Sequence, residues 1–274
     1  MIYQIIPSSP HLRAFVKDYT ILDFKVESSM PKMIKPFPAT PFHGLVFYLK
    51  GRITAYDSKT TTMQKFPKIA VNGQQVSHFD FHLPYEYLML SVNFQPCALS
   101  KFLRLPLVEL VDKRIDAEAI LNPQIQSIFE QLEYAPNYST MVKVVEQYLW
   151  QRIQSLKIER LPIDEVGCLM LDQNQYLPVE RWAQLACLSI SQFERRFVQQ
   201  MGVSPKLFLR INRFYKAFQM KERNPELDWL SIAYELDYSD YQHLVKDFKQ
   251  FAGSTPNSLI QAEAFAPEKI LLLR

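Results

Sequence analysis

The sequence predicts an α+β N-terminal domain, a small β-barrel or sheet with helices, followed by an all-α domain that contains two helix-turn-helix units. Three observations support this fold class. The chain has 274 residues, which corresponds to roughly two domains. Short runs with strand-like composition occur in the first ~95 residues, and apolar residues recur at helical spacing after them. The last hundred residues also contain an internal repeat, which indicates two similar helical units.

The first part of the chain is expected to be β-rich. Its β-type runs are bounded by glycine, proline, asparagine and aspartate, as strands usually are. A proline-rich segment at residues 30–41 (MPKMIKPFPATP) is expected to be an extended loop, because proline lacks the amide hydrogen that a helix needs. The predicted strands are residues 19–26, 44–50, 69–71 and 88–94.

Helical periodicity begins after this β-rich part. Apolar residues lie on one face of segments 98–103, 120–134 and 141–153. The apolar faces of the helices expected at residues 117–131 and 141–154 suit either packing on the barrel or a homodimer interface. We therefore place the first domain at residues 1–157, with a β-barrel-like part to about residue 95 and a helical part at 97–155.

The second domain is expected to be all-α and to span residues 162–262, after a linker at 155–162. No strand signal follows the linker, and short polar turns separate the helices. The two helix-turn-helix units are placed at 178–201 and 229–251. The predicted helices are residues 165–175, 179–186, 189–201, 205–223, 230–236 and 240–251.

The composition is that of a globular protein, with 48% hydrophobic and 22% charged residues. It excludes a disordered chain, a collagen and a disulfide scaffold. Three widely spaced cysteines form neither a disulfide framework nor a zinc knuckle, so we expect reduced thiols in a cytoplasmic protein. The N-terminal residues lack a signal-peptide pattern, and no apolar run is long enough to cross a membrane. The net charge of +3 is too small to identify a partner.

The repeat consists of two segments about fifty residues apart in the second domain. Each has an alanine, a serine six residues later, two apolar residues four apart, and a Gly-x-Ser/Thr-Pro sequence. The second copy has one extra residue after its serine. The matching residues are Ala183, Ser189, Phe193, Phe197 and Gly202 in the first copy, and Ala233, Ser239, Leu244, Phe248 and Gly253 in the second.

Each copy can be explained as two helices that cross over a tight turn. The small alanine allows the helices to approach closely, and Ser189 or Ser239 caps the second helix. The two apolar residues bury one face of that helix and leave the other face free. The glycine ends the helix, and Ser-Pro or Thr-Pro begins the next one. This arrangement is a helix-turn-helix.

With these duplicated motifs, residues 162–261 resemble the AraC/XylS family of bacterial transcription regulators. The resemblance implies that a long helix, which includes residues 212–223, joins the two units and that their second helices enter successive segments of the major groove of DNA. The N-terminal half resembles a regulatory domain found in part of the family. This likeness rests on residues 11–19 (HLRAFVKDY) and on residues 92–99 (VNFQPCAL), which Leu105-Pro-Leu follows.

The resemblance implies that Ser191 and Arg195 read bases in the first unit, and Gln242 and Lys246 in the second. Arg195 can bind guanine bidentately, Gln192 can pair with adenine, and a lysine contributes a point charge. The predicted base contacts are Ser191, Gln192, Arg195, Tyr241, Gln242 and Lys246, where Tyr241 has packing as its alternative role. The predicted phosphate contacts are Arg196, Lys206, Arg210, Arg213 and Lys249.

The two units differ in charge and in their turns. Residues 189–223 have a balance of +6, which suits phosphates, whereas residues 224–251 have a balance of −4. We therefore expect the first unit to supply most of the affinity, and the second to bind weakly, tune specificity or contact RNA polymerase.

Cys187 and Asp237 occupy turn positions where the family often has glycine. Because cysteine tolerates left-handed geometry poorly, the first turn is expected to have a different backbone shape.

Residues 78–86 (HFDFHLPYE) are the part of the first domain that most resembles a metal site. In a strand, His78, Asp80 and His82 would share one face, and the barrels of AraC-like proteins are often of the metal-binding cupin type. The alternative is a polar strand face opposite two phenylalanines. We favour this alternative because no third histidine has the required spacing, so we predict no metal and no cofactor.

The first domain is expected to bind a small-molecule effector or to form a homodimer. An aromatic interior could hold such a ligand, although aromatic residues are more often plain core. The candidate residues are Phe37, Phe42, Phe47, Tyr48, Tyr56 and Tyr87.

Together these features predict a bacterial, sequence-specific DNA-binding transcription regulator rather than an enzyme, with an activator favoured by family analogy. Its expected partners are double-stranded DNA and RNA polymerase, with no membrane. One alternative is a cupin-type metal-dependent enzyme fused to a helical module. Another is an interaction protein whose helix-turn-helix units have lost DNA binding.

Overall fold

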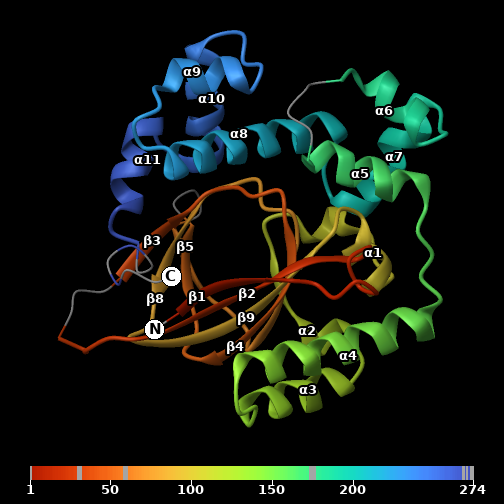
Figure 1. The fold of residues 1–274 in the computed structure, drawn as a ribbon, viewed down its shortest axis with the longest axis vertical. Helices are drawn as coiled ribbons and strands as arrows, with labels where there is room; N and C mark the ends of the chain where they lie inside the picture. Colours follow the sequence, from red (N-terminus) through yellow and green to blue (C-terminus); the bar gives the residue numbers. More distant parts are fainter. Residues whose placement is uncertain are drawn as a thin grey trace.

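The computed structural model describes residues 2–29, 33–57, 61–172, 177–266, 269 and 271 (Figure 1). Its strands are β1 Ile2–Pro7, β2 Val16–Lys25, β3 Met33–Phe37, β4 His43–Lys50, β5 Thr54–Asp57, β6 Thr62–Lys65, β7 Ile69–Asn72, β8 Phe79–Leu83, β9 Glu86–Phe94 and β10 Arg114–Asp116. Its helices are α1 Ala98–Leu103, the 3-10 helix η1 Leu107–Leu110, α2 Ala117–Ile120, α3 Gln124–Glu133, α4 Tyr138–Leu156, α5 Pro162–Asp172, α6 Val179–Leu185, α7 Ile190–Met201, α8 Pro205–Arg223, α9 Trp229–Glu235, α10 Tyr241–Ala252 and α11 Pro256–Glu263.

The strands form two antiparallel sheets, one of six strands in the order β1-β2-β9-β4-β7-β10 and one of four in the order β3-β8-β5-β6. The α+β architecture followed by a helical region is therefore confirmed. Among the described residues, no strand pairing closes either sheet into a barrel, so the barrel form of the prediction is replaced by two open sheets. We refer to residues 2–156 as the N-terminal region and to residues 162–266 as the helical region.

The six-stranded sheet is covered on both faces. One face packs against α3 and α4, where Phe47 and Leu90 meet Phe129 and Leu149. The other face packs against the four-stranded sheet in an aromatic layer. The strands of this sheet therefore bury side chains on both of its faces. Helices α3 and α4 lie below the sheet, and α8 crosses above it (Figure 1). The apolar faces proposed for a homodimer are therefore used for packing on this sheet.

All four predicted strands are present, as parts of β2, β4, β7 and β9. The proline-rich segment was expected to be a loop, but residues 33–37 of it form β3, while residues 30–32 lie outside the described residues. Proline is acceptable here because β3 is an edge strand and pairs only with β8. Four further strands, β1, β5, β6 and β10, had not been predicted, whereas β8 corresponds to the polar strand favoured for the histidine segment.

The predicted helices of the helical region match α5 to α10 within three residues, and α8 matches at both ends. The end predicted for α5, residues 173–175, lies outside the described residues. In the N-terminal region, the helix expected at 120–134 is divided into α2 and α3. The division occurs because Leu121 is extended and Pro123 begins the next helix.

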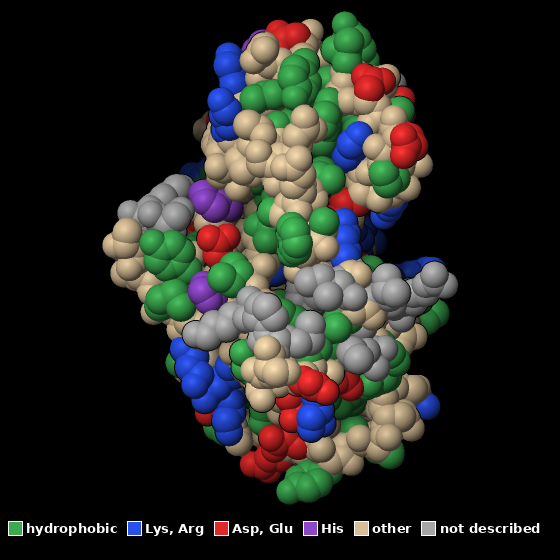
Figure 2. Space-filling view, turned by 90° about the vertical axis from the view of Figure 1, so that its left-hand side faces the viewer, with side chains coloured by type: hydrophobic (Ala, Val, Ile, Leu, Met, Phe, Trp, Pro, Cys, Tyr) green, Lys and Arg blue, Asp and Glu red, His purple; other side chains and the backbone are tan. Residues whose placement is uncertain are grey.

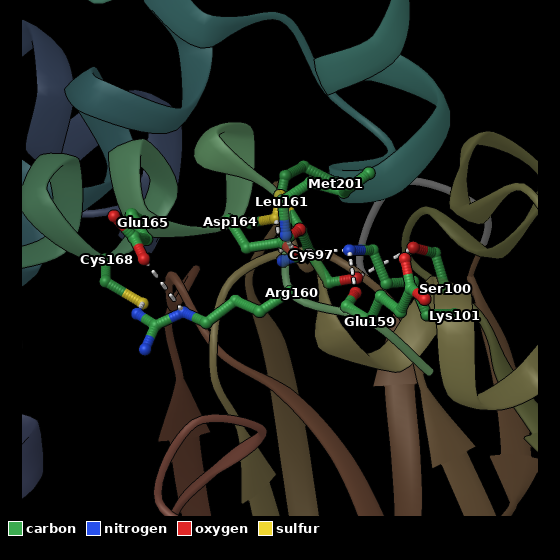
Figure 3. Close-up of polar contacts among 10 residues, drawn as sticks. All are labelled: Cys97, Ser100, Lys101, Glu159, Arg160, Leu161, Asp164, Glu165, Cys168 and Met201. Atoms are coloured by element: carbon green, nitrogen blue, oxygen red, sulfur yellow. Dashed lines mark hydrogen bonds and ion pairs between the residues drawn. The ribbon is translucent and has the colours of Figure 1, made fainter. Parts of the chain in front are cut away.

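The two regions are in direct contact at the start of α5. The Lys101 ammonium of α1 forms an ion pair with the Asp164 carboxylate of α5, and both side chains are largely buried (Figure 3). Lys101 also donates to the carbonyl oxygen of Glu159, 3.0 Å away, and the backbone N–H of Leu161 donates to Asp164 at 2.7 Å. The chain segment between the regions is thus fixed from both sides.

Acid is expected to destabilise the fold through His43, the first residue of β4. Its side chain is 2% exposed, and burial lowers its pKa to about 4. The unfolded chain, where the pKa is about 6.5, therefore takes up a proton that the folded chain does not, and the free energy of unfolding falls as the pH decreases between these values. We expect a loss of about 2 kcal/mol from pH 6.5 to pH 5, measured by urea unfolding. His43→Gln should flatten the profile in this window, and an unchanged slope would contradict the prediction.

Candidate nucleic-acid interface

The first helix-turn-helix unit consists of α6 and α7 packed against α8. Trp182, Ala183, Phe193 and Phe197 are fully buried in a first helical core. The ring of Phe197 meets that of Phe208 on α8 at 5.5 Å between centroids. Because one face of α7 is held in this core, its opposite face is directed to solvent.

The second unit repeats this arrangement with α9 and α10. Ala233, Leu244 and Phe248 are fully buried in a second helical core. The ring of Phe248 meets that of Phe214 on α8 at 4.8 Å. The two recognition helices, α7 and α10, are thus held by different aromatic residues of the same helix.

The turns of the two units have the same backbone shape, contrary to the expectation for Cys187. Cys187 and Asp237 both adopt left-handed geometry, with φ of 55° and 57°. In each turn the backbone N–H of the following residue donates to the carbonyl oxygen of the alanine of the repeat, from Leu188 to Ala183 at 3.0 Å and from Tyr238 to Ala233 at 2.9 Å. Tertiary packing therefore imposes the turn even on a cysteine.

The helix caps differ between the units. Ser189 caps α7 as expected, but Asp240 caps α10, with its carboxylate 2.8 Å from the backbone N of His243. Ser239 was the predicted cap and lies one residue earlier. The extra residue in the second copy explains this shift.

Most of the predicted base contacts are exposed. Ser191, Gln192 and Arg195 on α7, and Gln242 and Lys246 on α10, have exposed side chains. Tyr241 is half-buried and packs against the second helical core, which corresponds to its alternative packing role.

Gln192 also contributes to the cap of its own helix. Its side-chain oxygen accepts a hydrogen bond from the backbone N of Ser189 at 3.2 Å, and its backbone N donates to the Ser189 hydroxyl at 3.3 Å. This is a capping box, for which the Ser-x-x-Gln spacing is a signal in the sequence. Bidentate pairing with adenine would require Gln192 to release that oxygen.

The predicted phosphate contacts fall into two groups. Arg196, Lys206 and Lys249 are exposed. Arg210 and Arg213, in contrast, surround the carboxylate of Asp247 on α10, at 2.6 and 3.7 Å. The Tyr238 hydroxyl donates to the same carboxylate at 3.2 Å. The charges of these two arginines are therefore already neutralised in part by the protein itself.

Asp247 was counted only as an acidic charge in the sequence. It is 3% exposed and ties the second unit to α8. Its position between Leu244 and Phe251 on the buried side of α10 was the signal that it faces inward. Asn212 ties α5 to α8 in a related way, since its amide donates to the carbonyl oxygens of Met170 and Leu171 at the end of α5, both at 2.9 Å.

Helix α8 joins the two units. Its 19 residues correspond to about 28 Å of helix, and the units lie toward its two ends (Figure 1). Successive turns of the major groove are about 34 Å apart. The side of the molecule with α9 and α10 shows both acidic and basic side chains rather than a continuous basic surface (Figure 2).

The histidine segment of the N-terminal region contains strand β8, whose burial alternates as expected for a polar strand face opposite two phenylalanines. Phe79 and Phe81 of β8 are buried, and Asp80 and His82 alternate with them on a partly exposed face. His78 precedes the strand. Across the described ranges, no three His, Cys, Asp or Glu side chains gather closely enough to coordinate a metal ion.

The candidate aromatic residues do not line one ligand site. Tyr48 and Tyr87 belong to the layer between the sheets, whereas Phe47 faces α3 and α4. Phe42 stacks edge-on against Tyr215 of α8 at 5.3 Å. A small cavity of about 120 Å³ lies elsewhere, beside β5 and β6. It is lined by Ala55, Thr62, Gln64, Ser77, Phe79 and Asp112.

Comparison with protein families gives two matches. Residues 182–262 match a family model described as a helix-turn-helix domain, and residues 4–116 match a domain of unknown function, DUF6597. An uncharacterised HTH-type transcriptional regulator of Haemophilus influenzae is 30% identical over 127 residues, which is 46% of this chain. The match covers 41% of that relative, so this chain aligns with less than half of its length.

Two solved structures are also similar. ToxT from Vibrio cholerae has a TM-score of 0.48 at 11% identity, over 91% of this chain and 98% of that chain. The DNA-binding domain of AdpA, a global transcriptional factor solved with a target DNA, has a TM-score of 0.36 at 24% identity, over 38% of this chain and 95% of that chain. None of the helices in the described parts of this chain has the length and hydropathy that a bilayer crossing requires.

The left-handed turn at Cys187 generates one prediction. Cys187→Gly is expected to raise the free energy of unfolding by about 1 kcal/mol, because glycine adopts this geometry without the clash between Cβ and a carbonyl oxygen. Cys187 is exposed, so little packing is lost. Urea unfolding measures the change, and Cys187→Ala, which keeps the Cβ, is the control. An equal gain in the alanine variant would contradict backbone strain as the cause.

The ion pairs of Asp247 generate a second prediction. Asp247→Ala is expected to lower the free energy of unfolding by about 2 kcal/mol, because it leaves two partly buried arginines without their carboxylate. Glu235→Ala removes an exposed carboxylate from the same unit and should change stability by less than about 0.5 kcal/mol. If the two variants unfold at the same urea concentration, the Asp247 pairs do not stabilise the fold.

Proposed function

We propose that this chain, which carries a helix-turn-helix domain of the AraC type, is a sequence-specific DNA-binding transcription regulator that acts in the bacterial cytoplasm. The observation that supports this function best is the repeated geometry of α7 and α10. Each helix buries an apolar pair four residues apart and presents an exposed polar face. Both are mounted on one straight connector, as two groove-reading helices need to be.

In this proposal, Ser191 and Arg195 read bases from α7, and Gln242 and Lys246 read bases from α10. The guanidinium of Arg195 has the planar donor geometry that fits the two acceptors of guanine. Lys246 supplies a single positive charge and contributes less discrimination. Gln192 would donate a hydrogen bond to a base from its amide nitrogen, which the capping box does not use. Tyr241 would lie at the edge of the surface that contacts DNA.

The exposed cations Arg196, Lys206 and Lys249 are proposed to contact phosphates. Arg210 and Arg213 are assigned chiefly to holding Asp247, and they add to the positive potential near the DNA rather than forming direct phosphate contacts. Since Arg195, Arg196 and Lys206 all flank the first unit, we propose that this unit supplies most of the affinity.

We also propose that the regulator activates transcription and contacts RNA polymerase through α9. Leu230 and Tyr234 are 47% and 66% exposed there, beside the acidic Glu235 and Asp237. Such a mixed apolar and acidic surface would suit a basic protein partner. A small-molecule effector would act at the N-terminal region, which has a cavity of about 120 Å³ beside β5 and β6. A homodimer would require a surface other than α3 and α4, whose apolar faces are buried.

A metal-dependent enzyme and an interaction protein without DNA binding remain the competing functions, and a salt titration separates them from a regulator. The unaltered protein is expected to bind random duplex DNA with an affinity that falls steeply with salt, because each neutralised phosphate releases counterions. Affinity that does not depend on salt would contradict the proposed function.

The assignment of base contacts predicts unequal effects of two substitutions. On a duplex selected from a random pool, Arg195→Ala is expected to weaken binding by about 10- to 100-fold, the range expected for one lost bidentate base contact. Lys246→Ala should weaken it by roughly 2- to 5-fold. Arg181→Ala, which removes an exposed arginine from α6, serves as the control in fluorescence-anisotropy titrations. A larger loss for Lys246→Ala would show that the second unit dominates.

A further inference from the structure

Both recognition helices end at a glycine that touches the N-terminal region. Gly202 ends α7 with φ of 82°, and a Cβ there would lie 2.8 Å from the carbonyl oxygen of Leu107. Gly253 ends α10 with φ of 69°, and a Cβ there would collide with the imidazole ring of His78. Each glycine of the repeated Gly-x-Ser/Thr-Pro sequence therefore serves both as a helix end and as a point of close approach.

The contact at the end of α7 extends beyond the glycine. Met201 is fully buried, and its sulfur accepts a hydrogen bond from the backbone N of Cys97 at 3.0 Å (Figure 3). The ion pair between Lys101 and Asp164 lies beside it and joins α1 to α5. The first unit is thus held to α1 and η1 by apolar and polar contacts, and the ion pair holds the neighbouring helix α5 to α1.

The contact at the end of α10 has a similar extent. Ala39 is fully buried in the second helical core, and its backbone N donates to the carbonyl oxygen of Phe251 at 2.9 Å. The ring of Phe42 packs on Tyr215 in the middle of α8. The loop at residues 38–42 therefore holds the second unit and its connector.

Residues 73–78, which we call the bridging segment, connect the two contacts. Val76 packs against both the first and the second helical core. Asp112 holds the segment in place, since its carboxylate accepts from the backbone N of Val76 at 2.8 Å and of Ser77 at 3.1 Å.

A buried glutamine and arginine make the bridging segment rigid. The amide nitrogen of Gln75 donates to the carbonyl oxygens of Phe37, Pro38 and Ser77, at 2.9 to 3.0 Å. Its oxygen accepts from Arg114. The guanidinium of Arg114 in turn lies 4.3 Å from the ring centre of Phe79, between the two sheets. Buried polar groups with this many partners favour one conformation.

From these contacts we propose that the N-terminal region sets the distance and angle between the two recognition helices, so that the regulator discriminates among DNA sites by the number of base pairs between their two halves. Asp112, His78 and Val76 are positioning residues in this scheme. The proposal rests on the proposed DNA-binding function. It differs from a role in which the N-terminal region covers the DNA-binding surface, since the side chains proposed to read bases on α7 and α10 are exposed. Each inserted base pair moves one half-site by about 3.4 Å and turns it by about 35°, which a rigid pair of helices cannot follow.

The test uses the full chain and three duplexes: the site selected by the unaltered protein, and the same site with one or two base pairs inserted between its halves. The unaltered protein is expected to lose about 10-fold or more in affinity on insertion, in line with the cost of a mismatched contact. Asp112→Gly removes the carboxylate but keeps the left-handed backbone, where φ is 56°. Asp112→Gly and His78→Ala should reduce the insertion penalty to less than about 3-fold, because a released unit can shift on its connector.

Two matched variants serve as controls. Asp112→Asn keeps an oxygen acceptor and tolerates the same backbone geometry, and His82→Ala removes a histidine from β8 that is not at the docked glycine. Both should keep the full insertion penalty. The ratio of affinities separates positioning from general stability, since a partly unfolded variant would bind all three duplexes more weakly by the same factor.

The outcomes separate this inference from the proposed function. If the unaltered protein selects no site at all, the proposed function fails and this inference fails with it. If it selects a site but tolerates insertions, or if Asp112→Gly and His78→Ala keep the full penalty, DNA binding stands and the positioning role is wrong.

Discussion

The structure of the helical region depends on two aromatic contacts that α8 makes. Phe208 holds Phe197 of α7, and Phe214 holds Phe248 of α10. Burying aromatic residues of this size contributes several kcal/mol each, in the range of about 3–5 kcal/mol lost on truncation. Because both contacts come from one helix, α8 supports the inward faces of α7 and α10, while the outward faces proposed to meet DNA stay exposed.

The charged residues of the helical region serve two different purposes. Arg210 and Arg213 hold the buried Asp247, and thereby fasten the second unit to its connector. Arg195 and Arg196 remain exposed on α7. A count of charges along the sequence assigns all four arginines to one basic surface. In the structure, two of them, Arg210 and Arg213, instead form ion pairs with the buried Asp247. The second unit consequently presents one acidic charge fewer than its composition suggests, and the same ion pairs attach it to α8.

The N-terminal region packs directly against both helix-turn-helix units. Its sheet is closed off by α3 and α4 on one side, and its loops reach the ends of α7 and α10 on the other. The bridging segment lies between these loops and the interior that contains Arg114. Contacts of Gln75 and Asp112 thus connect the interior between the two sheets to the bridging segment, and Val76 of that segment packs on both helical cores.

The sequence alone was sufficient for the helical repeat, the boundaries of α8, the inward apolar pairs and the resemblance to AraC-type regulators. These features follow from local spacing, since helical periodicity, caps and turn glycines act within a few residues of one another. The tertiary structure alone decided that residues 33–37 form a strand, that Cys187 adopts a left-handed turn, that Asp247 captures two arginines and that Gly202 and Gly253 touch the N-terminal region. Each of these depends on packing that overrides local preference or on partners at least 34 residues away in the chain. The free energy of such contacts is defined only when the fold brings the partners together.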